Sequence, residues 1–303
     1  MKYCISYNAD FRHMAEVDEI ILDNYIGTDK IVEFVPELVK ENKSQRIIID
    51  LFYLTKPIEE VIIYIQKLIA DGYNITVKLN WKQEEEVKAL KDVGIPYLFN
   101  NFALNLEMAY SLAAAGSTDI YIAEELGFRL KDLQYIKNHF SVKLRVIPNI
   151  CQRQDNKSSC MQGFWIRPED TELYEPYVDV FEIIDWRKDN KPGSRLSVLY
   201  EIYKQRQWLG NINDIILDFD SSIIVNNKGI NPHFGEFRIN CGKRCYMGKC
   251  SLCKQTAFLA NTFVEGGIEL IKPKYKKITT EDDIIKAKEL LNEYKSNQEI
   301  SNS

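Results

Sequence analysis

The sequence lacks the features that would assign it to a membrane or secreted class. No run of about 18 apolar residues is present, which is the length that a membrane-spanning helix needs. The beginning of the chain, MKYCISYNADFRHMAEVDE, has no apolar stretch behind a basic one, so no signal peptide is expected. These absences predict a cytoplasmic protein with no membrane partner, in which thiols stay reduced.

Basic charge is scarce as well. The 39 Lys and Arg residues are outnumbered by 44 Asp and Glu residues, and the formal net charge is -5. A broad basic surface for duplex nucleic acid is therefore not expected, although a local basic patch is allowed. The GxSxG, HExxH and P-loop motifs are also absent. Without a nucleophile–base signature, peptide hydrolysis is the least favoured activity.

The first two-thirds of the chain alternates short apolar runs with amphipathic stretches. This alternation implies βαβ units and a parallel sheet. In the stretch 57–72, Pro57 suits a first helical turn and Gly72 suits a C-cap. Eight strand candidates favour a closed barrel over an open sheet, so residues 1–210 are predicted to form a TIM-like (β/α)8 barrel, regular or irregular. The candidates are 2–7, 19–25, 46–53, 74–81, 95–101, 119–127, 143–151 and 178–186.

The alternation stops near residue 210. Residues 211–260 are rich in Asn, Gly, Lys and Cys, and residues 278–295 have the pattern of a terminal helix. We therefore predict a second domain over 211–303, a cysteine-rich metal-binding extension that ends in a helix.

Six of the seven cysteines are candidates for metal binding, because clustered thiols in a reduced compartment more often bind metal than form disulfides. Four of them lie within CGKRCYMGKCSLC, a polar segment that makes a poor core, and two follow the strand 143–151. Thiolates this close in sequence can converge on one zinc ion or one iron–sulfur cluster, and spacing alone leaves both open. The six are Cys151, Cys160, Cys241, Cys245, Cys250 and Cys253.

Polar residues at the ends of the predicted strands are candidates for catalysis, because active sites of such barrels collect at the carboxyl ends of the strands. Glu124 and Glu125 are the best pair, since one of them must face the barrel if its strand continues. Arg167, in IRPED, either pairs with a carboxylate at a helix start or binds a substrate anion. Our candidates for catalytic groups are Glu124, Glu125, Arg167 and Asp185.

Several segments resemble the collagenase-like ("U thirty-two") peptidase family. They are VIPNICQRQDNKSSC, FWIRPEDTELYEPYVDVFEIIDWR, GSTDIYIAEELGFRLKDLQ and WLGNINDIILDF, and the resemblance covers roughly residues 115–255. It implies a TIM-type barrel in which four cysteines hold a 4Fe–4S cluster. Members of the family serve in oxygen-independent hydroxylation of a quinone precursor or a tRNA uridine, modify ribosomal RNA, or are described as proteases. By resemblance, Cys151 and Cys160 are ligands, completed by two or more of the other four cysteines.

Two hypotheses follow. The first is an iron–sulfur-dependent barrel enzyme that carries out a redox or hydroxylation-type modification of a small molecule or an RNA base, with an electron donor or another protein as partner. The second is a non-catalytic binding or assembly protein, stapled by zinc at residues 241–253. In that case the basic segment RINCGKRCYMGKCSLCK would contact nucleic acid or a protein.

Overall fold

The computed structural model describes residues 1–7, 14–22, 34–39, 44–52, 56–152, 163–185, 192–218 and 225–240. The chain divides into two compact units. The first contains residues 1–150 and 164–206, and the second contains residues 151–163 and 207–303. Residues 151–163, which follow a predicted strand, therefore belong to the same unit as the C-terminal part of the chain.

The described part of the first unit contains a parallel sheet of nine strands. Their order across the sheet is β5-β4-β3-β2-β1-β9-β8-β7-β6. The strands are β1 (Lys2–Ser6), β2 (Glu19–Leu22), β3 (Arg46–Asp50), β4 (Asn74–Leu79), β5 (Tyr97–Phe99), β6 (Phe102–Ala103), β7 (Asp119–Ile122), β8 (Lys143–Val146) and β9 (Val180–Ile183). Each predicted strand candidate contains one of these strands, so the eight predicted positions are confirmed, whereas β6 lies outside all of them and was not predicted.

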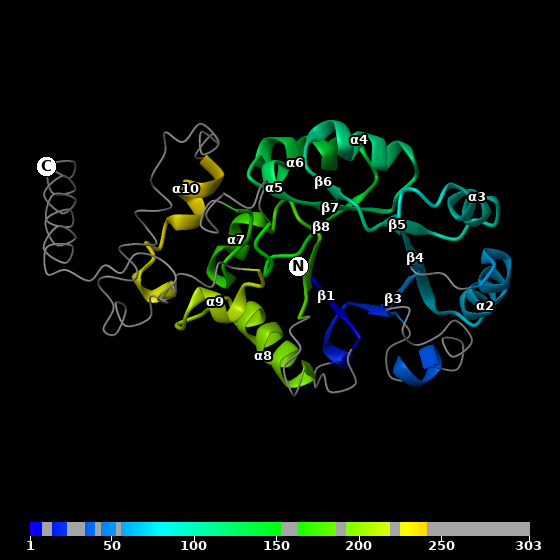
Figure 1. Cartoon of the computed structure of the whole chain (residues 1–303), viewed down its shortest axis with the longest axis horizontal. Coiled ribbons are helices and arrows are strands. Elements are labelled where there is room, and N and C mark those ends of the chain that lie inside the picture. The colour runs from blue at the N-terminus through cyan, green and yellow to red at the C-terminus, as the bar shows by residue number, and fades with distance from the viewer. Residues whose placement is uncertain are drawn as a thin grey trace, which may run out of the picture. The chain divides into compact units, whose positions relative to one another are not determined.

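The two strands at the ends of this order, β5 and β6, are consecutive parts of one extended segment, separated only by Asn100 and Asn101. On one side β5 pairs with β4, and on the other side β6 pairs with β7. In addition, the amide of Thr118, just before β7, donates to the carbonyl of Tyr97 at 2.8 Å. The sheet thus curls round until its two end strands meet in one segment, and Figure 1 shows its curve from β1 through β3, β4 and β5 to β8. The predicted α/β barrel-like fold is confirmed.

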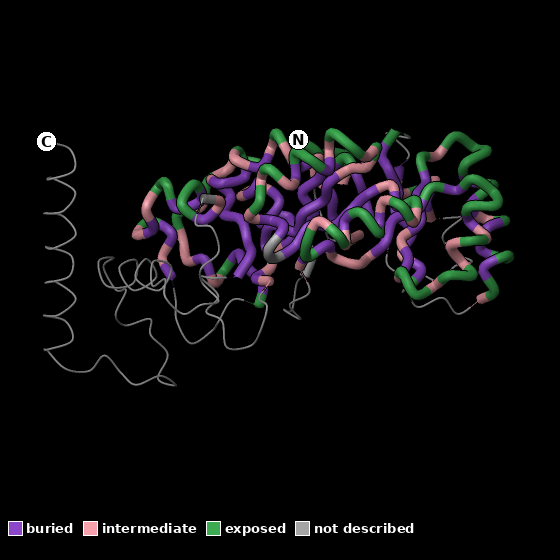
Figure 2. Tube along the Cα trace, turned by 90° about the horizontal axis from the view of Figure 1, so that it is seen from above, coloured by how far each residue is buried: buried purple, intermediate pink, exposed green. Residues whose placement is uncertain are grey.

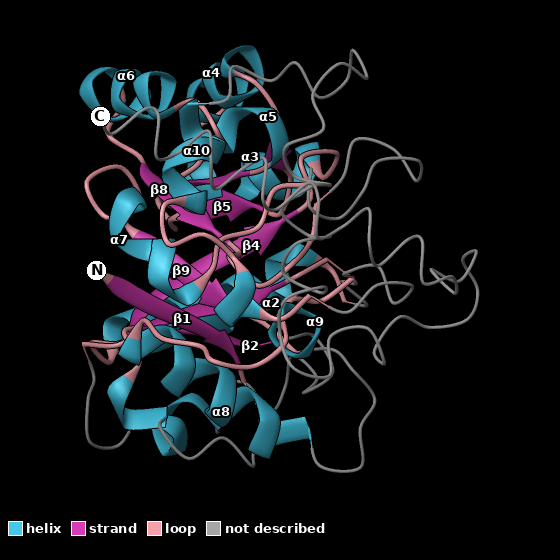
Figure 3. Cartoon of the chain, turned by 90° about the vertical axis from the view of Figure 1, so that its left-hand side faces the viewer, coloured by secondary structure: helices cyan, strands magenta, loops and turns pink. Residues whose placement is uncertain are grey.

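Helices follow most strands and lie outside the ring, with α4 and α6 on one side and α8 on the other (Figure 3). Helix α2 buries Val61, Ile65 and Leu68 along one face, follows Pro57 and is succeeded by Gly72 in the left-handed region (φ 87°), as predicted. Among the described residues, no helix has the length and apolar character needed to cross a membrane. The helices of this unit are α2 (Ile58–Ala70), α3 (Glu84–Asp92), α4 (Leu106–Ala114), α5 (Glu124–Gly127), α6 (Leu130–His139), α7 (Thr171–Tyr174) and α8 (Pro192–Gln205), with short turns η1 (Met14–Glu16) and η4 (Pro168–Asp170).

The strands are buried on both faces, while exposed residues gather on the outer helices (Figure 2). Strand β3 shows how the two faces differ. Arg46 donates to Thr76 on the neighbouring strand β4 and to Asp119 across the interior, so Arg46 and Asp50 face the interior. Ile47 and Ile49 then face the helices, and both are buried. Strand β3 therefore carries a charged residue at each end of its interior face, although its sequence looks continuously apolar.

Two strands end earlier than predicted. The strand expected over 119–127 ends at Ile122, and Glu124 begins helix α5. The strand expected over 143–151 ends at Val146, because Pro148 lacks the amide N–H that a continuing ladder would need. The alternation argument for Glu124 and Glu125 is therefore wrong, since these residues are helical.

The second unit contains short elements between residues 207 and 240. They are α9 (Ile212–Ile215), η5 (Asn227–Gly229) and α10 (Phe234–Asn240). Asn211 and Asn226 form an isolated antiparallel bridge, and the side-chain amide of Asn227 donates to the carbonyl of Trp208 at 2.6 Å. The helix predicted over 278–295 lies outside the described residues.

Candidate functional site

The interior of the barrel contains a network of buried charges near the amino ends of the strands. The network has five members, and each is at least 94% buried. Three of them, Glu19, Arg46 and Asp119, are the first residues of their strands, and the other two, Arg145 and Glu182, are the third residues of theirs. Charged residues are seldom fully buried unless they are paired, and here they are.

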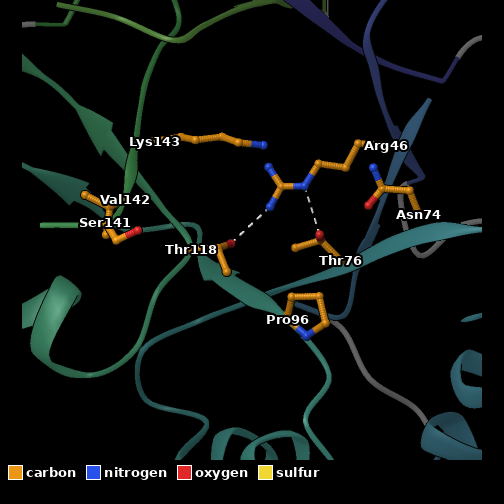
Figure 4. Close-up of a pocket in the computed structure, with 8 residues that line it drawn as sticks. All are labelled: Arg46, Asn74, Thr76, Pro96, Thr118, Ser141, Val142 and Lys143. Atoms are coloured by element: carbon orange, nitrogen blue, oxygen red, sulfur yellow. Dashed lines mark hydrogen bonds between the residues drawn. The ribbon is translucent and has the colours of Figure 1, made fainter. Parts of the chain in front are cut away.

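Arg46 is held by a bidentate interaction with Asp119. Two guanidinium nitrogens of Arg46 donate to the two carboxylate oxygens of Asp119, each at 2.7 Å. Its remaining donors reach the hydroxyls of Thr76 at 2.8 Å and Thr118 at 3.0 Å (Figure 4). The planar fork of arginine matches a carboxylate in this geometry, which fixes both side chains.

Arg145 connects the other carboxylates. It lies 3.2 Å from Glu182 and 3.3 Å from Asp119, and it donates to Glu19 as well. The hydroxyl of Tyr121 donates to Glu182 at 2.6 Å, and the guanidinium of Arg145 lies 5.5 Å from the centre of the same tyrosine ring. With Arg46, the network thus joins five strands across the interior, which are β2, β3, β7, β8 and β9.

Burial and pairing shift the pKa values of Asp119 and of two neighbouring groups away from neutral pH. Burial alone would raise the pKa of Asp119, but the hydrogen bonds and charge of Arg46 and the charge of Arg145 lower it to about 2. Burial, followed by the charge of Glu182, raises the pKa of Tyr121 well above its usual value. Burial also raises the pKa of Cys4, the interior thiol beside Arg145. None of these three groups exchanges a proton near pH 7, which indicates a stabilising role, as is usual at this end of a barrel.

The carboxyl ends of β3 and β4 carry a second charged pair. The amine of Lys78 lies 3.0 Å from Oδ2 of Asp50, and both side chains are about 15% exposed or less. The other oxygen of Asp50 accepts from the amide of Phe52 at 3.0 Å. Because Lys78 also lies 5.7 Å from the ring centre of Tyr121, the pair faces the interior at the end where barrel active sites form.

The predicted catalytic residues fall into different surroundings. Arg167 donates to both oxygens of Asp170, at 2.6 and 2.7 Å, and both residues are buried, as expected for an arginine that pairs with a carboxylate at a helix start. Asp185 follows β9, is 1% exposed and lies 3.5 Å from Arg195. Glu124 and Glu125 follow β7, but their side chains lie outside the described part of the chain. Their catalytic roles stay predictions.

Among the six predicted metal ligands, only Cys151 lies within the described residues. It is 5% exposed, and its amide donates to the carbonyl of Leu217 at 2.8 Å within the second unit. Two residues earlier, the amide group of Asn149 donates to the carbonyl of Ile184 at 2.6 Å and accepts from its N–H at 3.2 Å. This side chain continues the ladder between β8 and β9 beyond their last residues, and so fixes the chain just before Cys151.

The described residues contain no group of three or more His, Cys, Asp or Glu side chains placed to hold a metal ion. The remaining predicted ligands, Cys160, Cys241, Cys245, Cys250 and Cys253, lie outside those residues. The described parts of the second unit nevertheless connect the two cysteine segments. Arg238, three residues before Cys241, donates to the carbonyl of Gly163, three residues after Cys160.

The network of buried charges was not predicted. The sequence did contain a signal for this network, because charged residues stand within or at the start of largely apolar strands. These residues are Glu19, Arg46, Asp119 and Arg145. In a strand with two buried faces, a charged residue requires a partner. None of the five residues is among the predicted catalytic groups.

Comparison with known proteins shows similarity in fold alone. No model of a protein family matches the chain, and no curated protein matches it. A structure of the U32 peptidase Mk0906 is 12% identical, with 63% of this chain and 94% of that chain covered and a TM-score of 0.39. A native KDPGal structure is 9% identical (68% and 96% covered, TM-score 0.40), and 3-hexulose-6-phosphate synthase is 12% identical (69% and 100% covered, TM-score 0.38). The similarity to the U32 peptidase is a distant one of fold, so membership of that family stays a prediction.

Proposed function

We propose that this chain is an iron–sulfur-dependent enzyme on an α/β barrel, which modifies a small molecule or an RNA base by a redox or hydroxylation-type reaction. The observation that carries the proposal is the bond between Arg238 and Gly163. Gly163 lies three residues after Cys160 in the sequence, and Arg238 lies three residues before Cys241. The bond therefore joins residues next to two cysteine groups that are far apart in the sequence, which supports a shared site.

The donor set suits an iron–sulfur cluster. Cysteine thiolates are the ligands of such clusters, and six cysteines fall within the sequence ranges of the second unit. Cys151 and Cys160 would hold the cluster together with two of Cys241, Cys245, Cys250 and Cys253. When bound, the group would supply one-electron chemistry or polarise a substrate oxygen.

The carboxyl end of the barrel offers groups for binding and proton transfer. The amine of Lys78 would donate to a substrate oxygen, with Asp50 at 3.0 Å to hold the amine in place. Asp185, Glu124 and Glu125 would carry protons, because all three follow strands at this end. Arg167 would bind a substrate anion only by sharing its guanidinium with Asp170.

The test is metal and sulfide analysis of protein purified without oxygen, with its visible absorption spectrum. We expect a brown protein with iron and acid-labile sulfide. The substitutions Cys151→Ser and Cys160→Ser should each remove most of the iron. Cys4→Ala is the matched control, because Cys4 lies inside the barrel, and its iron content should equal that of the wild type.

A colourless protein with about one zinc per chain would contradict the iron–sulfur proposal. That result would favour the zinc-stapled binding protein instead. The two readings also differ in their response to Cys151→Ser. A zinc site made from residues 241–253 alone would keep its metal in this variant, whereas a site that includes Cys151 would lose it.

A further inference from the structure

We propose that the barrel has a second binding site at the amino ends of its strands, which takes a small metabolite through a phosphate or carboxylate group. A pocket of about 460 Å³ opens there. Its volume lies within the range of roughly 300–1,000 Å³ that is usual for small-molecule sites. Figure 4 shows the lining residues, which are Arg46, Asn74, Thr76, Pro96, Thr118, Ser141, Val142 and Lys143.

The pocket is built by segments that enter successive strands. Asn74 begins β4, Pro96 directly precedes β5, Thr118 directly precedes β7, and Lys143 begins β8. All of them belong to the first unit. The proposal is therefore independent of the cysteines and of the function proposed above, which concerns the carboxyl ends of the strands.

The charge of the lining favours an anion. It includes two cations, Arg46 and Lys143, and no carboxylate. The acidic partners of these cations, Glu19 and Asp119, are at most 1% exposed, whereas the side chain of Lys143 is 40% exposed. The cations Arg46 and Lys143 therefore face the pocket, while their acidic partners lie behind them. The pocket is thus locally positive, although the formal net charge of the chain is -5.

Lys143 is the residue that would bind the anion directly. Among the described residues its amine has one ionic partner, Oε1 of Glu19, at 3.6 Å, which is longer than a hydrogen bond. An ammonium group carries three donors, so an oxyanion can be bound without breaking this contact. Arg46, in contrast, is committed to Asp119, Thr76 and Thr118, and would contribute only its charge.

Neutral groups complete the site. Ser141 and Asn74 also line the pocket and offer hydroxyl and amide groups. Such groups suit the hydroxyls of a small molecule, and the pocket is larger than a single phosphate needs. The site therefore fits a small hydroxylated compound that carries a phosphate or carboxylate.

The test is isothermal titration of the full chain with inorganic phosphate and, separately, with succinate, at constant ionic strength. We expect saturable binding of at least one of them, and the preferred anion identifies the group that the site takes. Lys143→Gln should weaken binding about tenfold, as expected for the loss of a charged hydrogen bond. The matched control is Lys131→Gln, an exposed lysine of helix α6, which should bind as the wild type does.

The proposal is overturned if neither anion binds saturably, or if Lys143→Gln binds as tightly as the wild type. Ser141→Ala provides a second check, because it leaves the charge of the site unchanged. It should weaken binding less than Lys143→Gln does. Iron content should be unaffected in all three variants, so failure of this site and failure of the iron–sulfur proposal are distinguishable.

Discussion

Replacing Asp119 with asparagine is expected to destabilise the barrel at neutral pH and to flatten its response to acid. The substitution retains the size of the side chain but removes the charge that holds Arg46 through two bonds of 2.7 Å. Removing one partner of a buried ion pair costs about 3–5 kcal/mol, because the other charge remains buried. Arg145, 3.3 Å from Asp119, would lose part of its compensation as well.

The pH dependence follows from the pKa of Asp119, which is lowered from 3.8 to about 2. At about 1.4 kcal/mol per pKa unit, this lowering corresponds to about 2 kcal/mol of stability. For an acid with a depressed pKa, that stability is present above pH 3.8 and is lost as the pH falls towards 2. The difference in unfolding free energy between wild type and variant should therefore shrink by about 2 kcal/mol between roughly pH 5 and pH 2.

Urea unfolding at a series of pH values measures both effects. Asp92→Asn is the matched control, because Asp92 is exposed at the end of α3, and its effect should stay within about 0.5 kcal/mol at every pH. The reasoning would be refuted if the Asp119 variant were as stable as the wild type at pH 7. A gap that stays constant down to pH 2 would refute the assigned pKa.

Three further substitutions test separate parts of the structure. Tyr121→Phe removes the donor to Glu182 and should cost about 1–3 kcal/mol in urea unfolding; an unchanged midpoint would contradict the bond of 2.6 Å. Asn149→Ala should speed hydrogen exchange of the Ile184 amide, whereas exchange at the rate of the wild type would show that the amide does not depend on this side chain. Gly127→Ala should cost about 1–3 kcal/mol, because the added Cβ would lie 2.3 Å from the ring of Phe164; calorimetry showing no loss would mean that the ring moves away freely.

The positions of the strands could be predicted because each apolar run is bounded by polar residues and followed by a helical pattern. The ends of the strands could not. IPYLFNN reads as one strand up to Asn101, yet β5, which pairs with β4, ends at Phe99, and β6, which pairs with β7, begins only at Phe102. Likewise, IYIAEELG reads as one extended run, but the chain becomes helical at Glu124. In both cases the local sequence does not show where the strand ends, because the contacts with neighbouring strands decide its end.

For the buried charges inside the barrel, the sequence shows which residues face the interior, but it does not show which of them pair with one another. Alternation places Arg46 and Asp119 on the interior faces of their strands, but these strands are not neighbours in the sheet. Their side chains meet across the ring, and which side chains meet depends on the stagger of the strands, which hydrophobic patterns do not encode. The grouping of residues 151–163 with the C-terminal unit is unpredictable for the same reason, because it depends on contacts far apart in the chain.

The two ends of the barrel interior differ in what they can do, and Tyr121 links them. Its ring lies 5.5 Å from Arg145 in the buried network and 5.7 Å from Lys78 at the carboxyl ends of the strands. Burial alone would raise the pKa of Asp119, but Arg46 and Arg145 lower it to about 2, and burial raises the pKa of Tyr121 well above its usual range, so these two groups are unsuited to proton transfer at neutral pH. Asp50 and Lys78 lie at the carboxyl ends of the strands and are partly exposed. The reaction that we propose therefore belongs at the carboxyl ends, while the pocket at the amino ends serves the proposed binding of an anion.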